Sequence, residues 1–437
     1  MNTKALSVAT HPLFSMPEQI RSKWLRALLI WGLATLFYFY DNLLQVSPSA
    51  MKPELFQAFV QDAEQFGSLS AYCLYAYGLM QIPAGVLMDR FGPKRILTLA
   101  CVFCGIGSLV FGIATTLWEA KFGRMMIGVG AAFALVGCLE VAGFWFSAKR
   151  FALITGLTIT VGYLGAVFGL STVSKIVEIF GWRVSMQWGG CFGLLLGTVL
   201  WLVIPTGPQN AALEKSEAKN STFMVIGPFQ GLLQVMRHQQ TWIAALFAGF
   251  MFVPTVAFGG LWGIPFLVEA HGFDRVTAGF CISLIYLGWA IGAPFWGFVS
   301  DYFKVRNLPM RIATLVTLVN CLAVIYLDHL PLPFLQMLLF TLGFFSSGFI
   351  VAFAVVREMN PPLVAATAIG FTNALNTLWG ALAQPLIGKI LDLSRTSLRV
   401  EEQEIFSLTQ YQNALIVLPI ALIISFILLL FLQETQK

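Results

Sequence analysis

Long apolar runs, each ended by a short cluster of charges, repeat along the whole chain. Read from one charged cluster to the next, they predict twelve helices. Crossing a bilayer takes about 20 apolar residues, and each run is long enough to do so. The predicted helices lie near residues 25–50, 65–89, 96–118, 122–146, 151–174, 184–204, 241–268, 276–300, 311–328, 331–356, 363–391 and 412–432.

The composition agrees with a chain that is dissolved in lipid. Of the 437 residues, 58% are hydrophobic and only 11% are charged, whereas about a quarter of the residues in ordinary soluble domains are charged. A soluble core has no room for this much apolar side chain. The sequence therefore predicts an all-α integral membrane protein, and it excludes a water-soluble fold.

The basic residues indicate how the helices are oriented. If the N-terminus is cytoplasmic, 17 of the 26 Lys and Arg residues fall on the cytoplasmic side, as the positive-inside rule requires. These residues lie in short groups between the apolar runs, so the net charge of +5 does not indicate a nucleic-acid surface. No secretory signal is apparent. We expect both termini in the cytoplasm and a bacterial inner membrane, with an organelle membrane as the alternative.

A polar segment near the middle divides the chain into two halves of six predicted helices each. The linker is residues 205–240, between halves at 25–204 and 241–432, with tails at 1–24 and 433–437. The halves resemble each other, because "GVLMDRFGPKR" (85–95) and "GFVSDYFKVRN" (297–307) follow the second and the eighth helix. An internal repeat of six helices is typical of duplicated transporter folds.

Two motifs give the chain a family resemblance. "GVLMDRFGPKR" resembles the loop 2–3 motif of the major facilitator superfamily, and "GRMMIGVGAAFA" (123–134) resembles its helix-four motif. A weaker likeness, carried by "FWFSAKRFALITGLTITVGYLG" and "MQWGG", is to the branch that contains the lysosomal dipeptide transporter. The resemblance implies a secondary transporter that works by alternating access. It also implies gating residues in the first motif and its repeat: Gly85, Asp89, Arg90, Gly92, Arg95 and Asp301.

The sequence departs from the family pattern at two places. Tyr302 stands where the first half has Arg90, so we expect weaker charge contacts around Asp301. The fifth helix lacks the Gly-Pro signature of drug/proton antiporters, which favours symport or facilitated uptake. Arg357 and Glu358 end the tenth helix and are interpreted as a gate or topology pair.

Asp41 and Glu140 are the two ionisable residues that lie well inside predicted spans. A charge in hydrocarbon costs about 2.5–3.5 kcal/mol on insertion scales, so such residues face a cavity or serve a function. At 1.5 Å per residue, Asp41 lies about 22 Å from Arg26 and Glu140 about 13 Å from Lys149, which suits two stations of a proton relay. The alternatives are a structural Asp41 bonded to neighbouring tyrosines and a Glu140 that reaches interfacial water.

Other polar and aromatic residues inside the spans are candidates for a cavity lining. Arg124 begins the fourth helix, where a headgroup anchor is favoured over binding of a substrate carboxylate or phosphate. Amides and aromatic rings inside spans line a cavity or hold helices together. The candidates are Tyr38, Tyr40, Gln45, Tyr72, Tyr75, Tyr163, Trp262, Tyr286, Trp289, Asn373, Asn376 and Gln384.

The seventh predicted helix contains "FVPTVAFGGLWGIPF" (252–266), in which Pro and Gly free backbone groups and permit a bend. A bending gate is one interpretation, and ordinary use of these residues in membrane helices is the other. Cys101 and Cys104 form a CxxC pair, which we interpret as small apolar residues at a helix interface.

The sequence shows no enzyme chemistry. The four histidines lack metal-ligand spacing, and there is no phosphate-binding loop and no nucleophile elbow. We expect no cofactor and no metal. The expected partners are a small solute, protons and lipid, with no nucleic acid, and the protein is expected to act as a monomer. The expected function is proton-coupled symport of a dipeptide or amino acid, or of an organic anion. A uniporter or antiporter, or a transport-inactive membrane sensor, is the alternative.

Overall fold

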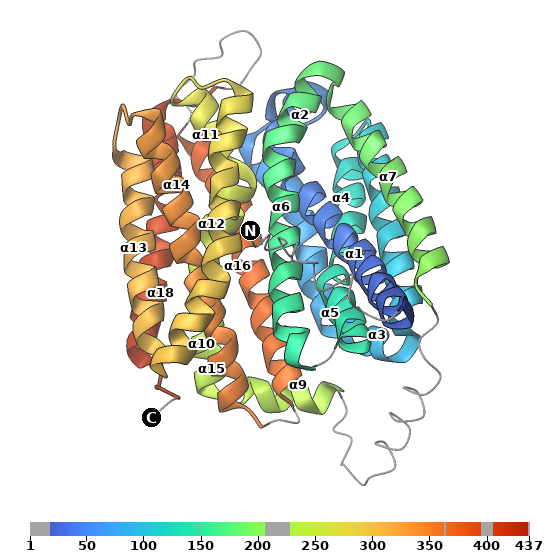
Figure 1. Ribbon diagram of the computed structural model, residues 1–437. Coiled ribbons are helices and arrows are strands. Elements are labelled where there is room, and N and C mark those ends of the chain that lie inside the picture. The colour runs from blue at the N-terminus through green and yellow to red at the C-terminus, as the bar shows by residue number, and fades with distance from the viewer. Residues whose placement is uncertain (1–17, 147, 206–227, 362–363, 395–404, 436–437) are drawn as a thin grey trace, which may run out of the picture.

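The protein is described by a computed structural model that covers residues 18–146, 148–205, 228–361, 364–394 and 405–435. Two helical bundles stand side by side, the N-half from α1 to α7 and the C-half from α10 to α18 (Figure 1). Between them in sequence lies α9 (Pro228–Met236), a short helix at the lower edge of the bundle in this view.

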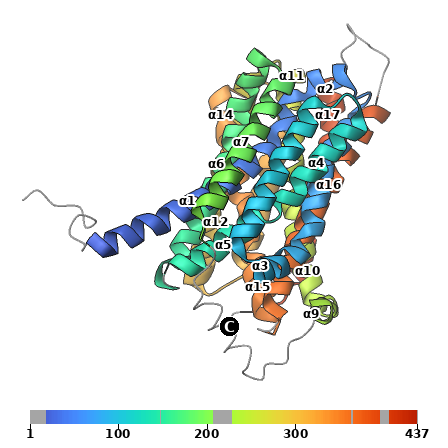
Figure 2. The same cartoon turned by 90° about the vertical axis from the view of Figure 1, so that its right-hand side faces the viewer.

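The N-half forms six helical spans. Its elements are α1 (Glu18–Val46), η1 (Ser47–Met51), α2 (Lys52–Ala58), α3 (Ala63–Ile113), α4 (Leu117–Ala131), α5 (Ala134–Trp145), α6 (Ala148–Phe180) and α7 (Trp182–Val203). The long α3 is two spans joined at Gly92, whose φ of 76° and ψ of 160° are not helical. The first turns of α1 project from the bundle (Figure 2).

The C-half forms six more spans over the residues that the structure describes. Its elements are α10 (Gln239–Val253), η2 (Pro254–Trp262), α11 (Gly263–Glu269), α12 (Arg275–Phe303), α13 (Asn307–Tyr326), α14 (Leu332–Ser346), η3 (Ser347–Ile350), α15 (Val351–Met359), α16 (Ala365–Leu393), α17 (Leu408–Leu415) and α18 (Val417–Phe431). Each of the twelve predicted helices overlaps an observed span, so the predicted fold class is confirmed.

Within the described ranges, ten helices are long and apolar enough to cross a membrane by length and composition. The first span of α3 and α16 are not among them, and these two pack against each other across the boundary between the halves. The backbones approach closely, because a Cβ on Gly67 would lie 2.4 Å from the carbonyl oxygen of Gln384.

The segment from α10 to α11 departs from regular helix where the sequence predicted a bend. Pro254 begins η2, a π-helical segment that ends at Trp262. Pro lacks the backbone N–H that would donate to the carbonyl of the preceding turn, so the regular hydrogen-bond pattern is interrupted here. Short π-helical segments inside α-helices are often found at functional sites. The predicted irregularity is confirmed, and this segment forms part of the cavity described next.

Candidate functional site

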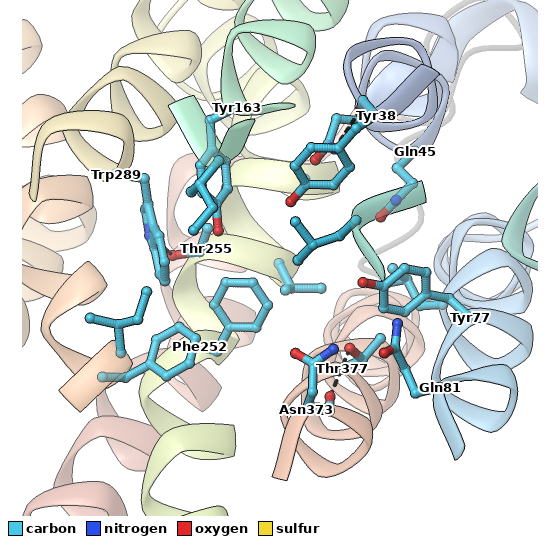
Figure 3. A pocket seen from close by; sticks show the side chains of 18 of the residues that line it. Tyr38, Gln45, Tyr77, Gln81, Tyr163, Phe252, Thr255, Trp289, Asn373 and Thr377 are labelled. Carbon is cyan, nitrogen blue, oxygen red and sulfur yellow. Dashed lines mark hydrogen bonds between the residues drawn. The ribbon is translucent and has the colours of Figure 1, made fainter. Parts of the chain in front are cut away.

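A cavity of about 500 Å³ lies between the two halves (Figure 3). Residues of α1, α3, α5 and α6 line it from one side, and residues of α10, η2, α12, η3, α15 and α16 from the other. Seven of the twelve candidates for a cavity lining lie in its wall, together with residues that the sequence did not single out. The seven are Tyr38, Gln45, Tyr163, Tyr286, Trp289, Asn373 and Gln384.

One wall of the cavity is polar. Tyr77 and Gln81 of α3 lie beside Asn373 and Thr377 of α16 (Figure 3). Tyr77 and Gln81 belong to the N-half and Asn373 and Thr377 to the C-half, so both halves contribute to this wall. Tyr77, Gln81 and Thr377 were not predicted as lining residues.

The opposite wall is aromatic. Trp289 packs against Tyr163, Phe252 and Phe349 with ring centroids 5.2, 5.4 and 5.1 Å apart. Its indole N–H donates to the hydroxyls of Thr255 and Ser346, both at 2.9 Å. Because Trp289 is almost fully buried, it braces the rings of Tyr163 and Phe252, which are more exposed.

Asp41 lies directly behind the cavity wall. It is fully buried and does not line the cavity, but its neighbours Asn42 and Gln45 do. Its Oδ1 accepts hydrogen bonds from Asn42 Nδ2 at 2.8 Å and from Gln45 Nε2 at 3.5 Å. Its Oδ2 is buried without a hydrogen-bond partner. The expected bonds to tyrosines are replaced by bonds to two cavity-lining amides.

The titratable groups near Asp41 come from three elements. Tyr38 lies on its own helix, α1, and Cys138 faces it from α5. From α3, four groups are near enough to interact with its charge: Cys73, Tyr77, Cys101 and Cys104. None of these described neighbours is a cation. Asp41 therefore has no ion-pair partner among them, and an uncompensated buried carboxylate is costly.

Other predicted site residues lie outside the cavity lining. Glu140 is partly exposed on α5, next to the lining residue Leu139. Trp262 is buried and donates its indole N–H to the Gln384 carbonyl at 3.0 Å. Asn376 is buried, and both of its amide atoms lack hydrogen-bond partners. Three predicted tyrosines also lie away from the lining: Tyr40, Tyr72 and Tyr75.

Arg124 corrects the expectation of a headgroup anchor, because its side chain is fully buried. Its two terminal nitrogens donate to the carbonyls of Leu44 at 2.7 Å and Gln45 at 2.9 Å. These carbonyls belong to the last turn of α1. The last carbonyl groups of an α-helix have no backbone N–H partner within the helix, so they need donors from elsewhere. A buried cation at this end also suits the helix dipole. Arg124 thus fixes the end of α1 that carries Gln45 into the cavity.

Replacing Arg124 by Leu removes two hydrogen bonds, and one bond to a charged group is usually worth about 1.5–3 kcal/mol. The stability of the protein is therefore expected to fall by at least that amount. Thermal unfolding in detergent measures the effect. Arg183→Leu is the matched control, because partly exposed Arg183 donates one bond, to the Ala114 carbonyl at 2.9 Å. Equal stability of Arg124→Leu and the wild type would contradict this structural role.

The end of the molecule that carries α2 is closed by contacts between the halves; we call these contacts the α2-end latch. Lys52 is 4% exposed and forms an ion pair with Glu269 at the end of α11. Tyr411 donates to the same carboxylate at 2.9 Å. Closer to solvent, Arg275 pairs with Glu54 at 2.6 Å. The latch thus combines a buried ion pair with a partly exposed one.

Asp392, near the end of α16, adds a further contact to the latch. Its two oxygens accept from the backbone N–H groups of Ala63 at 3.0 Å and Glu64 at 2.8 Å. These N–H groups begin α3, and a carboxylate at a helix N-terminus is favoured by the helix dipole. The carboxylate of one half therefore caps a helix of the other half.

The opposite end, which carries α15, has a charge cluster within the C-half. Arg306 pairs with Asp301 at 2.7 Å and with Glu358 at 2.6 Å. Burial lowers the pKa of Arg306, but hydrogen bonds and charges from Glu358 and Asp301 outweigh it, so the pKa is raised overall. This corrects the expectation of weak charge contacts around Asp301. Arg306 lies five residues after Asp301 and supplies the positive charge that Tyr302 lacks.

The C-terminal segment joins this cluster. Glu434 accepts from the backbone N–H groups of Arg306 and Asn307, both at 2.9 Å, and thereby caps α13. Arg357 and Glu358 are both exposed, and Glu358 pairs with Arg306 across the cluster.

The predicted gating residues of the first half lie at the α15 end. Gly85 is exposed and lines the cavity, so the cavity reaches towards this end. Gly92 has a positive φ, which only glycine adopts easily, and it turns the chain between the two spans of α3. Arg90 and Arg95 are exposed. The side chain of Asp89 lies outside the described part of the structure.

Comparisons with known proteins agree with this architecture. A family model described as Major Facilitator Superfamily matches residues 30–384 and 255–437. The membrane sensor protein UhpC of Salmonella typhimurium is 23% identical, over 88% of this chain and 90% of that protein. The lysosomal dipeptide transporter MFSD1 of Danio rerio is 24% identical, over 89% and 85%.

A solved structure shares the fold. It is a bacterial homologue of the human lysosomal transporter Spinster, in an inward-facing and unoccupied conformation. Its TM-score is 0.71 with 17% sequence identity, and the match covers 93% of this chain and 95% of that one. At this identity the likeness concerns the fold alone.

Proposed function

The chain belongs to the major facilitator superfamily, and on that premise we propose that it is a secondary active transporter for a small polar organic solute. The observation that carries this proposal is the cavity between two halves whose α2 end is latched by ion pairs. In alternating access, two halves rock around such a site near the midplane. The protein is a carrier rather than an enzyme, and it acts as a monomer.

The distribution of Lys and Arg assigns the α15 end to the cytoplasm. On this assignment both termini are cytoplasmic. The membrane that we propose is a bacterial inner membrane. The conformation described here is then closed towards the outside, and its cavity extends towards the cytoplasm. Release of the α2-end latch is the step that opens the cavity outwards.

Transport is coupled to protons through Asp41. An ionised carboxylate only accepts hydrogen bonds, whereas a protonated one also donates one. Asn42 and Gln45 donate to Oδ1, and Oδ2 has no partner. Protonation of Asp41 weakens Oδ1 as an acceptor and adds a donor beside it, and we expect this to shift the two amides that line the cavity. Asp41 thus acts on the solute through its two neighbours. Glu140, on the same side of the cavity, is the candidate second station of the relay.

The solute classes that the family likeness puts forward are a dipeptide or amino acid first and an organic anion second. The similarity to MFSD1 supports the first class for this chain. A membrane sensor is the second candidate function, and the similarity to UhpC supports it. The cavity of about 500 Å³ is within the usual range for solute sites, so it suits a carrier and a solute-binding sensor alike.

Uptake by purified protein in liposomes separates a carrier from a sensor. The radiolabelled panel contains alanyl-alanine for the first class, galactarate and glucose 6-phosphate for the second, and uridine as an uncharged polar solute. Liposomes with the protein are expected to take up at least one of them faster than empty liposomes do. A protein that binds a panel member without moving it would be a sensor.

A further inference from the structure

The described part of the cavity wall carries no formal charge. Its described lining contains no Lys, Arg, His, Asp or Glu. Arg124 is a buried cation close to this site, but its terminal nitrogens are bound to the Leu44 and Gln45 carbonyls. A phosphate or carboxylate that entered the cavity would lose its hydration without gaining a cation, and this is costly. The lining therefore disfavours anions.

Gln384 adds an unpaired hydrogen-bond acceptor to the lining. Its side chain is 2% exposed, and its Nε2 donates to the Val256 carbonyl at 3.0 Å. Its Oε1 is buried without a hydrogen-bond partner. A buried acceptor is satisfied only by a donor, such as an N–H or O–H group of a solute. A fully ionised phosphate or carboxylate has no such proton to donate.

The two walls differ in a way that fits a flat molecule. The rings of Tyr163 and Phe252 stand on the aromatic side, and Tyr77, Gln81 and Asn373 on the polar side (Figure 3). Aromatic faces bind flat rings by stacking, which is worth about 1–3 kcal/mol per ring. Amides and hydroxyls opposite them offer both donors and acceptors to the edge of that ring.

We infer that the cavity selects uncharged solutes that carry a flat unsaturated ring with N–H or O–H donors, as nucleosides and nucleobases do. The ring lies on the aromatic wall, and the N–H and O–H groups of the solute face the amides and hydroxyls of the polar wall. This inference rests on the proposed transport function and narrows its substrate class. It predicts that uncharged ring compounds bind more tightly than dipeptides, amino acids or organic anions, the classes that the family likeness puts forward.

A thermal-shift panel on the purified full-length protein tests this selection, because a ligand that binds the native state raises its apparent stability. The probes are uridine and adenosine, their 5′-monophosphates, galactarate and alanyl-alanine. We expect each nucleoside to bind at least about tenfold more tightly than its monophosphate. Equal or tighter binding of a monophosphate, galactarate or alanyl-alanine would overturn the inference, and so would no response to either nucleoside.

Variants of one helix test the aromatic wall. Phe252→Leu keeps apolar volume but removes the ring, so uridine affinity is expected to fall about tenfold, and Phe252→Tyr is expected to restore it. Phe250→Leu is the control, because Phe250 stacks on Trp379 at 4.4 Å and lies outside the lining. Equal losses in Phe250→Leu and Phe252→Leu, or no loss in either, would contradict a stacked ring.

The uptake experiment distinguishes failure of this inference from failure of the proposed function. If galactarate or glucose 6-phosphate is taken up and uridine is not, the inference fails while the transport function stands. If uridine binds but is not moved, the inference stands and the transport function fails.

Discussion

Replacement of Asp41 by Asn is expected to abolish proton-driven accumulation of the solute while leaving the protein folded. Asn has the same size as Asp but takes up no proton in the physiological range. The variant therefore holds Asn42 and Gln45 in one arrangement at every pH. Solute exchange without a gradient is expected to persist. Uptake into proteoliposomes with and without an imposed pH gradient measures both properties.

Two further variants control this experiment. Glu178→Gln removes an exposed acid on α6 and is expected to behave as the wild type does. Glu140→Gln tests whether Asp41 acts alone or in a proton relay with Glu140. If the two form a relay, the Glu140→Gln variant also loses gradient-driven uptake; if Asp41 acts alone, it does not. Accumulation by Asp41→Asn at the wild-type level would refute the coupling role of Asp41.

Breaking the buried ion pair of the α2-end latch is expected to open the outer end of the cavity. Lys52→Met leaves the Glu269 carboxylate with Tyr411 and the Phe406 N–H but without a cation. Removing one partner of a buried pair typically costs about 3–5 kcal/mol. Because this cost falls on the latched conformation, the unlatched population is expected to rise more than tenfold.

A cysteine at the latch measures this change. Ser49 is 1% exposed and donates to the Leu261 carbonyl of the other half at 2.7 Å, so Ser49→Cys is protected while the latch is closed. Among the described cysteines, Cys191 is the exposed one, so it would react with the maleimide as well. The Cys191→Ser substitution removes this background labelling. Lys52→Met is expected to raise the rate at which Ser49→Cys reacts with a water-soluble maleimide.

The partly exposed pair of the latch, Arg275 with Glu54, provides a matched comparison for the buried pair. Arg275→Gln breaks the pair with Glu54, whose partners are both more than a fifth exposed, and such pairs contribute about 1 kcal/mol or less. Its effect on labelling is expected to be small. The exchanged pair, Lys52→Glu with Glu269→Lys, is expected to restore protection. Labelling that is unchanged by Lys52→Met would show that the pair does not hold the latch.

The helices were predictable because lipid imposes a simple rule on the sequence. Apolar runs had to be long and charges had to fall at their ends, so every predicted span overlaps an observed one. The fifth span shows where the rule fails. Lys175 and Glu178 suggested an end near residue 174, but both are exposed and α6 continues to Phe180. A charge at the interface ends an apolar run without ending the helix.

The site was predictable only in part. Asp41, Tyr38 and Gln45 could be found because polar groups in the middle of a span are rare. The sequence did not reveal that Asp41 lies behind the wall, since orientation around a helix depends on packing. It also placed Arg124 at the headgroups, because a position near a span end does not show what the side chain can reach.

The ion pairs between distant segments were missed for a related reason. Lys52 and Glu269 are 217 residues apart, and each alone looks like a topology charge at the end of a span. Their pairing depends on how the two halves close, which no local pattern records. The same is true of Arg306, whose partner Glu358 lies on another helix.

The central claim is that this chain moves a solute against its gradient by using protons. The most direct measurement is accumulation of the solute with the fastest uptake in the panel, in proteoliposomes that are more acidic outside than inside. We expect accumulation above the external concentration, which collapses when a protonophore is added. Equal uptake with and without the gradient, reaching only the external concentration, would contradict proton coupling and leave a uniporter.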